Sequence, residues 1–167
     1  MEKRCRRRDF LIGGTLAVGG SLLGGRVLAA TETAVTKGGF KGYVEIDPGL
    51  FAGINRVANP ADKSILEKKH APVIAVPAKI VAGESFAVTL TMGEIDHPMG
   101  PAHYIQNVDL LVGNEPAGHV EFRPEVATAK ATVYIRLDRP VTLVARAYCN
   151  LHGLWESRLE VSPVPAA

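Results

Sequence analysis

The chain has 167 residues, 47% of them hydrophobic and 22% charged, which suits one globular domain with a core of normal size. This composition excludes a disordered or collagen-like chain, and two cysteines exclude the disulfide framework of small secreted domains. The net charge of +2 comes from residues 1–30, because 13 of the 19 cations and 15 of the 17 anions fall in residues 31–167. We therefore expect no nucleic-acid partner.

In residues 1–30, a basic segment, an apolar run and a small-residue stretch follow one another as in a secretion signal. The sequence RRDFL at 7–11 precedes an apolar, glycine-rich run over 12–28, and small residues follow at Ala29 and Ala30. The paired arginines are typical of a twin-arginine export signal, so we expect a periplasmic protein cleaved after Ala29 or Ala30. The alternative is an uncleaved membrane anchor, which the glycines of the run disfavour. The twin-arginine route exports folded proteins, many of them with a cofactor, so it favours a metal or redox centre.

Residues 31–66 carry glycine, charge and little periodicity, and we expect an extended N-terminal arm there. One short strand near 43–46 and a short helical turn over 64–69 are its only predicted elements. The Asp-Pro-Gly sequence at 47–49 is a turn signal. The remaining residues, 67–167, are expected to form the main domain.

From Ala71 onward apolar and polar residues alternate, as they do in half-buried strands. The alternation is clearest over 85–92 and 131–137. Further strands are predicted over 72–76, 104–112, 120–122, 141–148 and 155–161, separated by turn signals at 82–84, 113–116 and 138–140. About seven short strands without a long helical pattern predict an all-β fold, an antiparallel β-sandwich.

Four of the five histidines lie at or just outside the ends of predicted strands: His70, His97, His103 and His152. Loop ends on a rigid sandwich are common places for functional sites. The fifth, His119, lies in a turn-like stretch, and we expect it to be exposed and without function.

Cys149 and His152 give the sharpest local pattern. A thiolate and an imidazole three residues apart, after a strand, can converge on one metal ion. The alternative is a buried structural cysteine beside a surface histidine. His97 and His103 are separated by proline and glycine, which would hold two imidazoles at a set distance. Five protein ligands exceed the four of a closed zinc site and suit iron with a sixth position open.

Three motifs resemble those of the superoxide reductase family, the neelaredoxins and desulfoferrodoxins. They are KHAPVI at 69–74, the H-P-x-x-x-x-H spacing at 97–103 and CNLHGLWES at 149–157. The resemblance covers about residues 67–161.

The resemblance implies an immunoglobulin-like β-sandwich with one mononuclear iron per chain. His70, His97, His103 and His152 would be its equatorial ligands, and Cys149 its axial ligand. Superoxide would be reduced by one electron to hydrogen peroxide at the open position, with Lys69 attracting the anion. No cysteine cluster of a rubredoxin-like domain precedes the sandwich, so we expect an external electron donor. We also expect a homo-oligomer.

Two positions depart from the family pattern. The family often has Glu two residues before its first His ligand, where this chain has Lys68, with Glu67 one residue further back. Met99 stands where Asn is common. Two other functional classes stay open, a cupredoxin-like copper electron-transfer protein and a non-catalytic binding subunit of a periplasmic redox or sulfur system.

Overall fold

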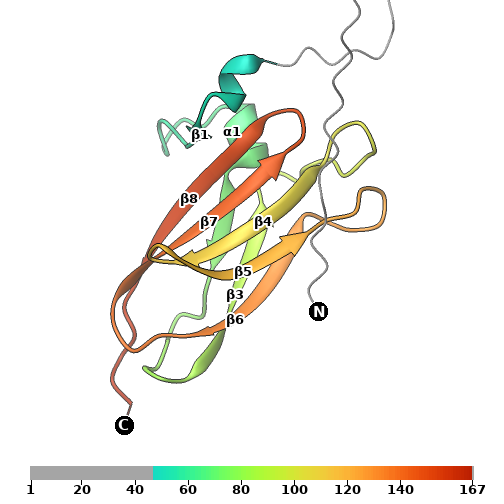
Figure 1. The fold of residues 1–167 in the computed structure, drawn as a ribbon. Helices are drawn as coiled ribbons and strands as arrows, with labels where there is room; N and C mark the ends of the chain where they lie inside the picture. The colour runs from blue at the N-terminus through green and yellow to red at the C-terminus, as the bar shows by residue number, and fades with distance from the viewer. Residues whose placement is uncertain (1–46, 167) are drawn as a thin grey trace, which may run out of the picture. The chain divides into compact units, whose positions relative to one another are not determined.

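The computed structural model describes residues 47–166. Its elements are η1 (a 3-10 helix, Pro48–Phe51), β1 (Ile54–Asn55), α1 (Ile65–His70), β2 (Pro72–Ala75), β3 (Ser85–Met92), β4 (Ile105–Val112), β5 (Glu115–Glu121), β6 (Lys130–Arg136), β7 (Val141–Cys149) and β8 (Gly153–Val161). The strands form one sheet of order β1-β8-β7-β4-β5 and a second of order β2-β3-β6 (Figure 1). Every pairing is antiparallel except that of β1 with β8.

Regular alternation explains why β3 forms and where it packs. Its residues Phe86, Val88, Leu90 and Met92 are all buried, whereas the side chains between them face outward. They meet buried residues of β4 and β7 in one hydrophobic cluster between the two sheets. Each fully buried side chain of this size contributes roughly 1.5–3 kcal/mol to folding. The prediction of an all-β fold with antiparallel sheets is confirmed, and its immunoglobulin-like classification stays a prediction.

The strand predicted over 120–122 is longer than expected and begins at Glu115. The turn that we expected over 113–116 ends two residues earlier, because Gly113 has a φ of +62° and lets the chain reverse sharply. Pro116 interrupts the strand signal in the sequence. It is tolerated because β5 lies at the edge of its sheet.

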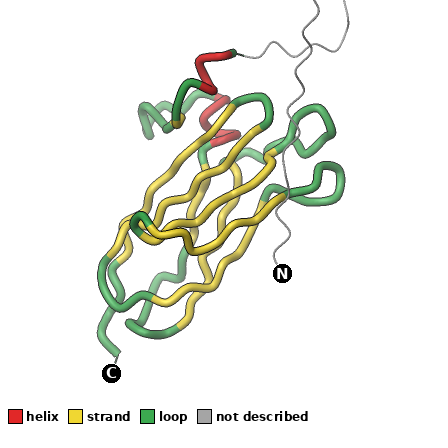
Figure 2. Tube along the Cα trace, in the orientation of Figure 1, coloured by secondary structure: helices red, strands yellow, loops and turns green. Residues whose placement is uncertain are grey.

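Residues 47–66, which we expected to be an extended arm, contain η1, β1 and the start of α1 (Figure 2). Asp47 starts η1, since its side chain accepts a hydrogen bond of 2.8 Å from the amide of Gly49. β1 was not predicted, because two residues are too short for any periodicity. The strand expected near 43–46 and the leader lie outside the described residues, and the domain boundaries stay predictions. Within residues 47–166, no helix is long and apolar enough to span a bilayer.

Candidate metal centre

His70 is the last residue of α1, and the short helix is built to hold it. Ser64 and Glu67 form a capping box: the Ser64 hydroxyl accepts from the Glu67 amide at 3.2 Å, and Glu67 Oε2 accepts from the Ser64 amide at 2.7 Å. The His70 ring is 1% exposed, and its Nδ1 lies 2.7 Å from the carbonyl oxygen of Leu66, one helical turn back. A carbonyl oxygen only accepts, so Nδ1 carries the proton and Nε2 is left bare.

The loop that carries His97 is fastened to the end of α1. The amides of Glu94 and Ile95 donate to the carbonyl oxygen of Lys68 at 2.7 and 3.1 Å. Gly93 has a φ of +85°, and a Cβ there would collide with the helix backbone. The buried His97 ring donates from Nδ1 to the Pro98 carbonyl oxygen at 2.6 Å, so its Nε2 is also bare.

His103 and the Cys149–His152 turn complete the site. His103 precedes β4, and its Nε2 is buried without a hydrogen-bond partner in the described residues. Cys149 is the fully buried last residue of β7, and its Sγ lies 3.4 Å from Nδ1 of His152. The backbone amides of Leu151 and His152 donate to this sulfur, as expected for a thiolate ligand held in a tight turn.

These five side chains come together at one end of the sandwich. Each offers a ligand atom, and the ligand atoms of His70, His97, His103, Cys149 and His152 lie within 4.8 Å of one another. The two bare nitrogens of His70 and His97 are 3.0 Å apart. Two lone pairs at that distance repel each other unless a cation lies between or beside them. The buried, unpartnered Nε2 of His103 would also be stabilised by a cation, so the donor set fits a metal ion.

Burial keeps the imidazoles in the form that binds metal. It lowers the pKa of His70 to about 4 and that of His97 to about 3, and it also lowers the pKa values of His103 and His152. All four rings are therefore neutral near pH 7. Burial raises the pKa of the Cys149 thiol, partly offset by the two amides that donate to its sulfur. Metal binding must therefore release the thiol proton.

Lys69 and Glu67 have different places. Burial is the main cause of the lowered pKa values of His70 and His103, and the positive charge of half-buried Lys69 lowers them further. Lys69 therefore places a cation beside the cluster. The Glu67 carboxylate accepts from the amides of Ala58 and Ser64, each at 2.7 Å, and is not among the clustered groups. Its role here is to cap α1.

Two residues near the cluster had no assigned role in the sequence analysis. The Trp155 ring stacks on the His70 ring, with centroids 5.4 Å apart and planes 27° apart, and its Nε1 donates to the carbonyl oxygen of His152 at 2.9 Å. Asn55 donates from Nδ2 to the carbonyl oxygens of Leu50 and Leu154 at 2.8 and 3.0 Å. Trp155 lies within the C-terminal motif at 149–157, and its place there could have indicated that it is near the site. Nothing in the sequence singles out Asn55, since its partner Leu154 lies 99 residues away along the chain.

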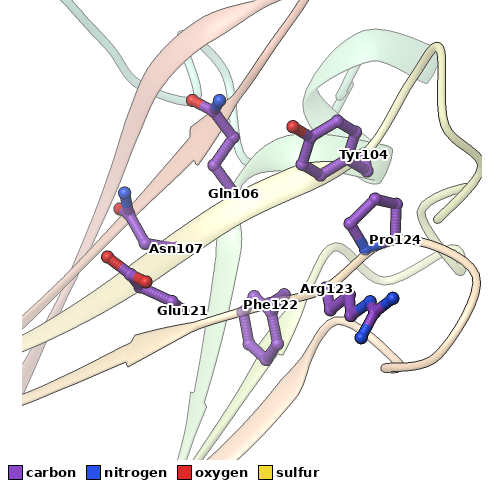
Figure 3. A pocket seen from close by; sticks show the side chains of 7 residues that line it. All are labelled: Tyr104, Gln106, Asn107, Glu121, Phe122, Arg123 and Pro124. Atoms are coloured by element: carbon purple, nitrogen blue, oxygen red, sulfur yellow. The ribbon is translucent and has the colours of Figure 1, made fainter.

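The remaining histidine lies elsewhere. His119 is an exposed residue of β5, with Nδ1 2.6 Å from a carboxylate oxygen of Asp109 on β4, and that hydrogen bond raises its pKa. A groove of about 440 Å³ beside β4 and β5 also contains no ligand of the cluster (Figure 3). Its lining residues are Tyr104, Gln106, Asn107, Glu121, Phe122, Arg123 and Pro124.

Comparison with known proteins gives the same family from sequence and from structure. The desulfoferrodoxin family profile matches residues 62–158, more than half of the chain. The neelaredoxin of Megalodesulfovibrio gigas is 31% identical over 114 residues, which cover 57% of this chain and 88% of that one. The superoxide reductase of Pyrococcus horikoshii is 31% identical over 104 residues, covering 56% and 88%.

Among solved structures, the superoxide reductase (neelaredoxin) of Ignicoccus hospitalis superposes with a TM-score of 0.59 at 30% identity. The match covers 72% of this chain and all of that one. The matched segment of the family profile contains all five clustered side chains. This chain belongs to the desulfoferrodoxin family.

Proposed function

We propose that this protein is a superoxide reductase that uses one mononuclear iron held by His70, His97, His103, His152 and Cys149. The observation that carries the proposal is the convergence of these five donor atoms within 4.8 Å. Four imidazoles and one thiolate suit iron, whereas a copper electron-transfer site of the cupredoxin kind uses two histidines and the cysteine with a weak axial ligand. The relatives named superoxide reductase support the same activity.

The donor atoms follow from the hydrogen bonds. His70 and His97 would bind through Nε2, because Nδ1 of each donates to a carbonyl oxygen. His103 would bind through its unpartnered Nε2, and His152 through Nδ1, the atom beside the sulfur. Bound iron would supply the electron that superoxide accepts and a coordination position that these five ligands leave free. The amides that donate to Cys149 Sγ would tune how strongly the sulfur donates electron density.

The reaction adds one electron and two protons to superoxide and releases hydrogen peroxide. Lys69 would draw the anion to the site, since its charge acts on His70 and His103. His103 and His152 are only half-buried, so water at this side of the cluster can deliver the protons. The electron must return to the protein from an external donor, which we expect to be a separate redox protein.

We also propose that residues 1–30 direct the protein to the periplasm by the twin-arginine pathway. The motif at 7–11 and the small residues before 31 support this. Replacing Arg7 and Arg8 with lysine should leave the protein in the cytoplasmic fraction, and unchanged periplasmic recovery would contradict the proposal. The homo-oligomer stays a prediction.

The stoichiometry of the reaction tests the proposed activity. The reduced, iron-loaded protein is mixed rapidly with superoxide, and peroxide is measured against superoxide consumed. A reductase yields one peroxide for every superoxide and leaves the iron oxidised. A dismutase would yield half as much peroxide together with dioxygen, and that result, or no reaction, would contradict the proposal.

A further inference from the structure

The segment before α1 lies directly on the turn that carries two of the clustered side chains. Gly153, the residue after His152, has a φ of +69°, and a Cβ there would collide with the carbonyl oxygen of Leu50 in η1. Beyond η1, β1 runs parallel to β8, with Ile54 opposite Leu154. The backbone of this segment therefore contacts the end of the Cys149–His152 turn, called the ligand turn below, without side chains between them.

Asn55 joins the two backbones. Its Nδ2 donates at 2.8 Å to the carbonyl oxygen of Leu50 and at 3.0 Å to that of Leu154, which uses both protons of the amide. The carbonyl oxygen of His152 lies 3.4 Å from the same nitrogen and accepts the Trp155 indole N–H at 2.9 Å. The carbonyl oxygen of His152, at the end of the Cys149–His152 turn, therefore accepts from Trp155 and lies beside the Asn55 amide. Asn55 holds the carbonyl oxygen of Leu154, two residues after the turn.

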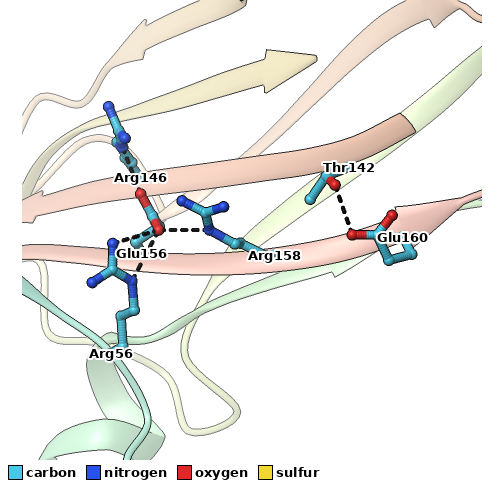
Figure 4. Close-up of polar contacts among 6 residues, drawn as sticks. All are labelled: Arg56, Thr142, Arg146, Glu156, Arg158 and Glu160. Carbon is cyan, nitrogen blue, oxygen red and sulfur yellow. Dashed lines mark hydrogen bonds and ion pairs between the residues drawn. The ribbon is translucent and has the colours of Figure 1, made fainter. Parts of the chain in front are cut away.

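Arg56 fastens the segment at the next residue. Its Nε and Nη2 donate to Oε1 of Glu156 at 3.0 and 2.8 Å (Figure 4). Glu156 is 2% exposed, so the ion pair anchors Arg56 to an immobile group on β8. Asn55 and Arg56 thus attach to Leu154 and Glu156 of β8, close to the Cys149–His152 turn.

We propose that residues 48–56 form a clamp that sets the geometry of the Cys149–His152 turn, with Asn55 as its positioning residue. The amides of Leu151 and His152 that donate to Cys149 Sγ belong to this turn. The clamp holds the chain directly after the turn, at Leu154, and Asn55 lies beside the last carbonyl of the turn, that of His152. A shift of the backbone at 152–154 would change the hydrogen bonds to the sulfur. The clamp lies outside residues 62–158 that the family profile matches. The inference rests on the proposed function only in taking Cys149 and His152 as ligands.

Two variants of Asn55 separate hydrogen bonding from space filling. Asn55→Ala removes the amide, whereas Asn55→Asp keeps its shape but replaces the donor with a carboxylate oxygen that faces carbonyl oxygens. The matched control is Asn59→Ala, in the same part of the chain. The Asn59 side chain accepts from the amide of Ala61 at 3.1 Å and makes no hydrogen bond to the ligand turn.

Hydrogen exchange of the backbone amides at 150–154, measured on the full iron-free chain, is the first readout. Loss of two hydrogen bonds should speed their exchange about tenfold or more in both Asn55 variants and leave Asn59→Ala unchanged. Unchanged exchange within β3 shows that the variants are folded. The second readout is the energy of the visible thiolate-to-iron band after iron loading and oxidation, which should shift in both Asn55 variants only.

If the amides at 150–154 of Asn55→Asp exchange at the wild-type rate and the thiolate-to-iron band is unshifted, the proposal is overturned. The shape of the side chain alone would then be enough to hold the turn. Equal loosening of the turn in Asn59→Ala would also overturn it, since the effect would not be specific to Asn55. The exchange measurement needs neither iron nor superoxide. Fast exchange in the Asn55 variants of a protein that does not reduce superoxide would therefore refute the proposed function and support the clamp.

Discussion

Glu156→Gln tests the buried charge cluster beside the candidate metal centre. Oε1 of Glu156 accepts from Arg56 and Arg158, and Oε2 accepts from Arg146 at 2.8 Å (Figure 4). Burial alone would raise the pKa of Glu156, but hydrogen bonds from Arg146, Arg158 and Arg56 lower it to about 2. Glutamine keeps the shape of the side chain and removes the charge.

The size of the effect follows from the pKa. A drop from 4.5 to about 2 corresponds to about 3 kcal/mol of stabilisation when the carboxyl is ionised. This figure is an upper limit, because the arginine side chains are 34–57% exposed and water screens them. The folded-state pKa lies below the unfolded-state pKa, so the stabilisation is complete above pH 4.5 and is lost as the pH falls toward 2.

Urea unfolding, followed by fluorescence of Trp155, measures the unfolding free energy of the wild type and of Glu156→Gln at a series of pH values from 7 to 3. Trp155 is the single tryptophan of the chain. The wild type should exceed Glu156→Gln in unfolding free energy by up to about 3 kcal/mol at pH 7, and the gap should narrow below pH 4.5. The histidines titrate in both proteins, so the difference isolates Glu156. A gap that stays constant down to pH 3, or no gap at all, would show that the Glu156 charge does not stabilise the fold in this way.

Three further substitutions test the assignment of roles. Cys149→Ser should abolish the visible thiolate-to-iron band and most superoxide reduction, and a variant that retains both would show that the sulfur is not a ligand. His119→Ala should bind as much iron as the wild type, because His119 pairs with Asp109 away from the cluster; reduced iron content would mean a wrong ligand set. Lys69→Ala should slow the reaction with superoxide roughly tenfold and weaken its dependence on salt, whereas an unchanged rate and salt dependence would remove Lys69 from the mechanism.

Local patterns made most strands predictable. β3 was predicted over its observed range, because its alternation is uninterrupted and both neighbouring strands cover it. β5 was predicted too short, since the sequence alone does not show that Pro116 lies on a sheet edge, where it costs no ladder hydrogen bond. β1 depends entirely on its pairing with β8, about one hundred residues later in the chain.

In the candidate site too, local patterns could be predicted and contacts between distant residues could not. His97, His103, Cys149 and His152 lie in short motifs whose spacing indicates a metal, and the structure brings them together with His70. Their role as iron ligands stays a prediction. The contacts of Asn55 with Leu154 and of Arg56 with Glu156 span 99 and 100 residues and have no local pattern. The sequence therefore indicates the candidate ligands, whereas the contacts that hold their backbone in place can be found only in the fold.

Metal analysis of the purified protein, with visible spectra before and after oxidation, establishes whether the five clustered side chains hold iron. We expect one iron per chain and a thiolate-to-iron band that appears on oxidation and is absent from Cys149→Ser. Copper with an intense blue band, or no bound metal after anaerobic reconstitution with ferrous iron, would contradict this expectation.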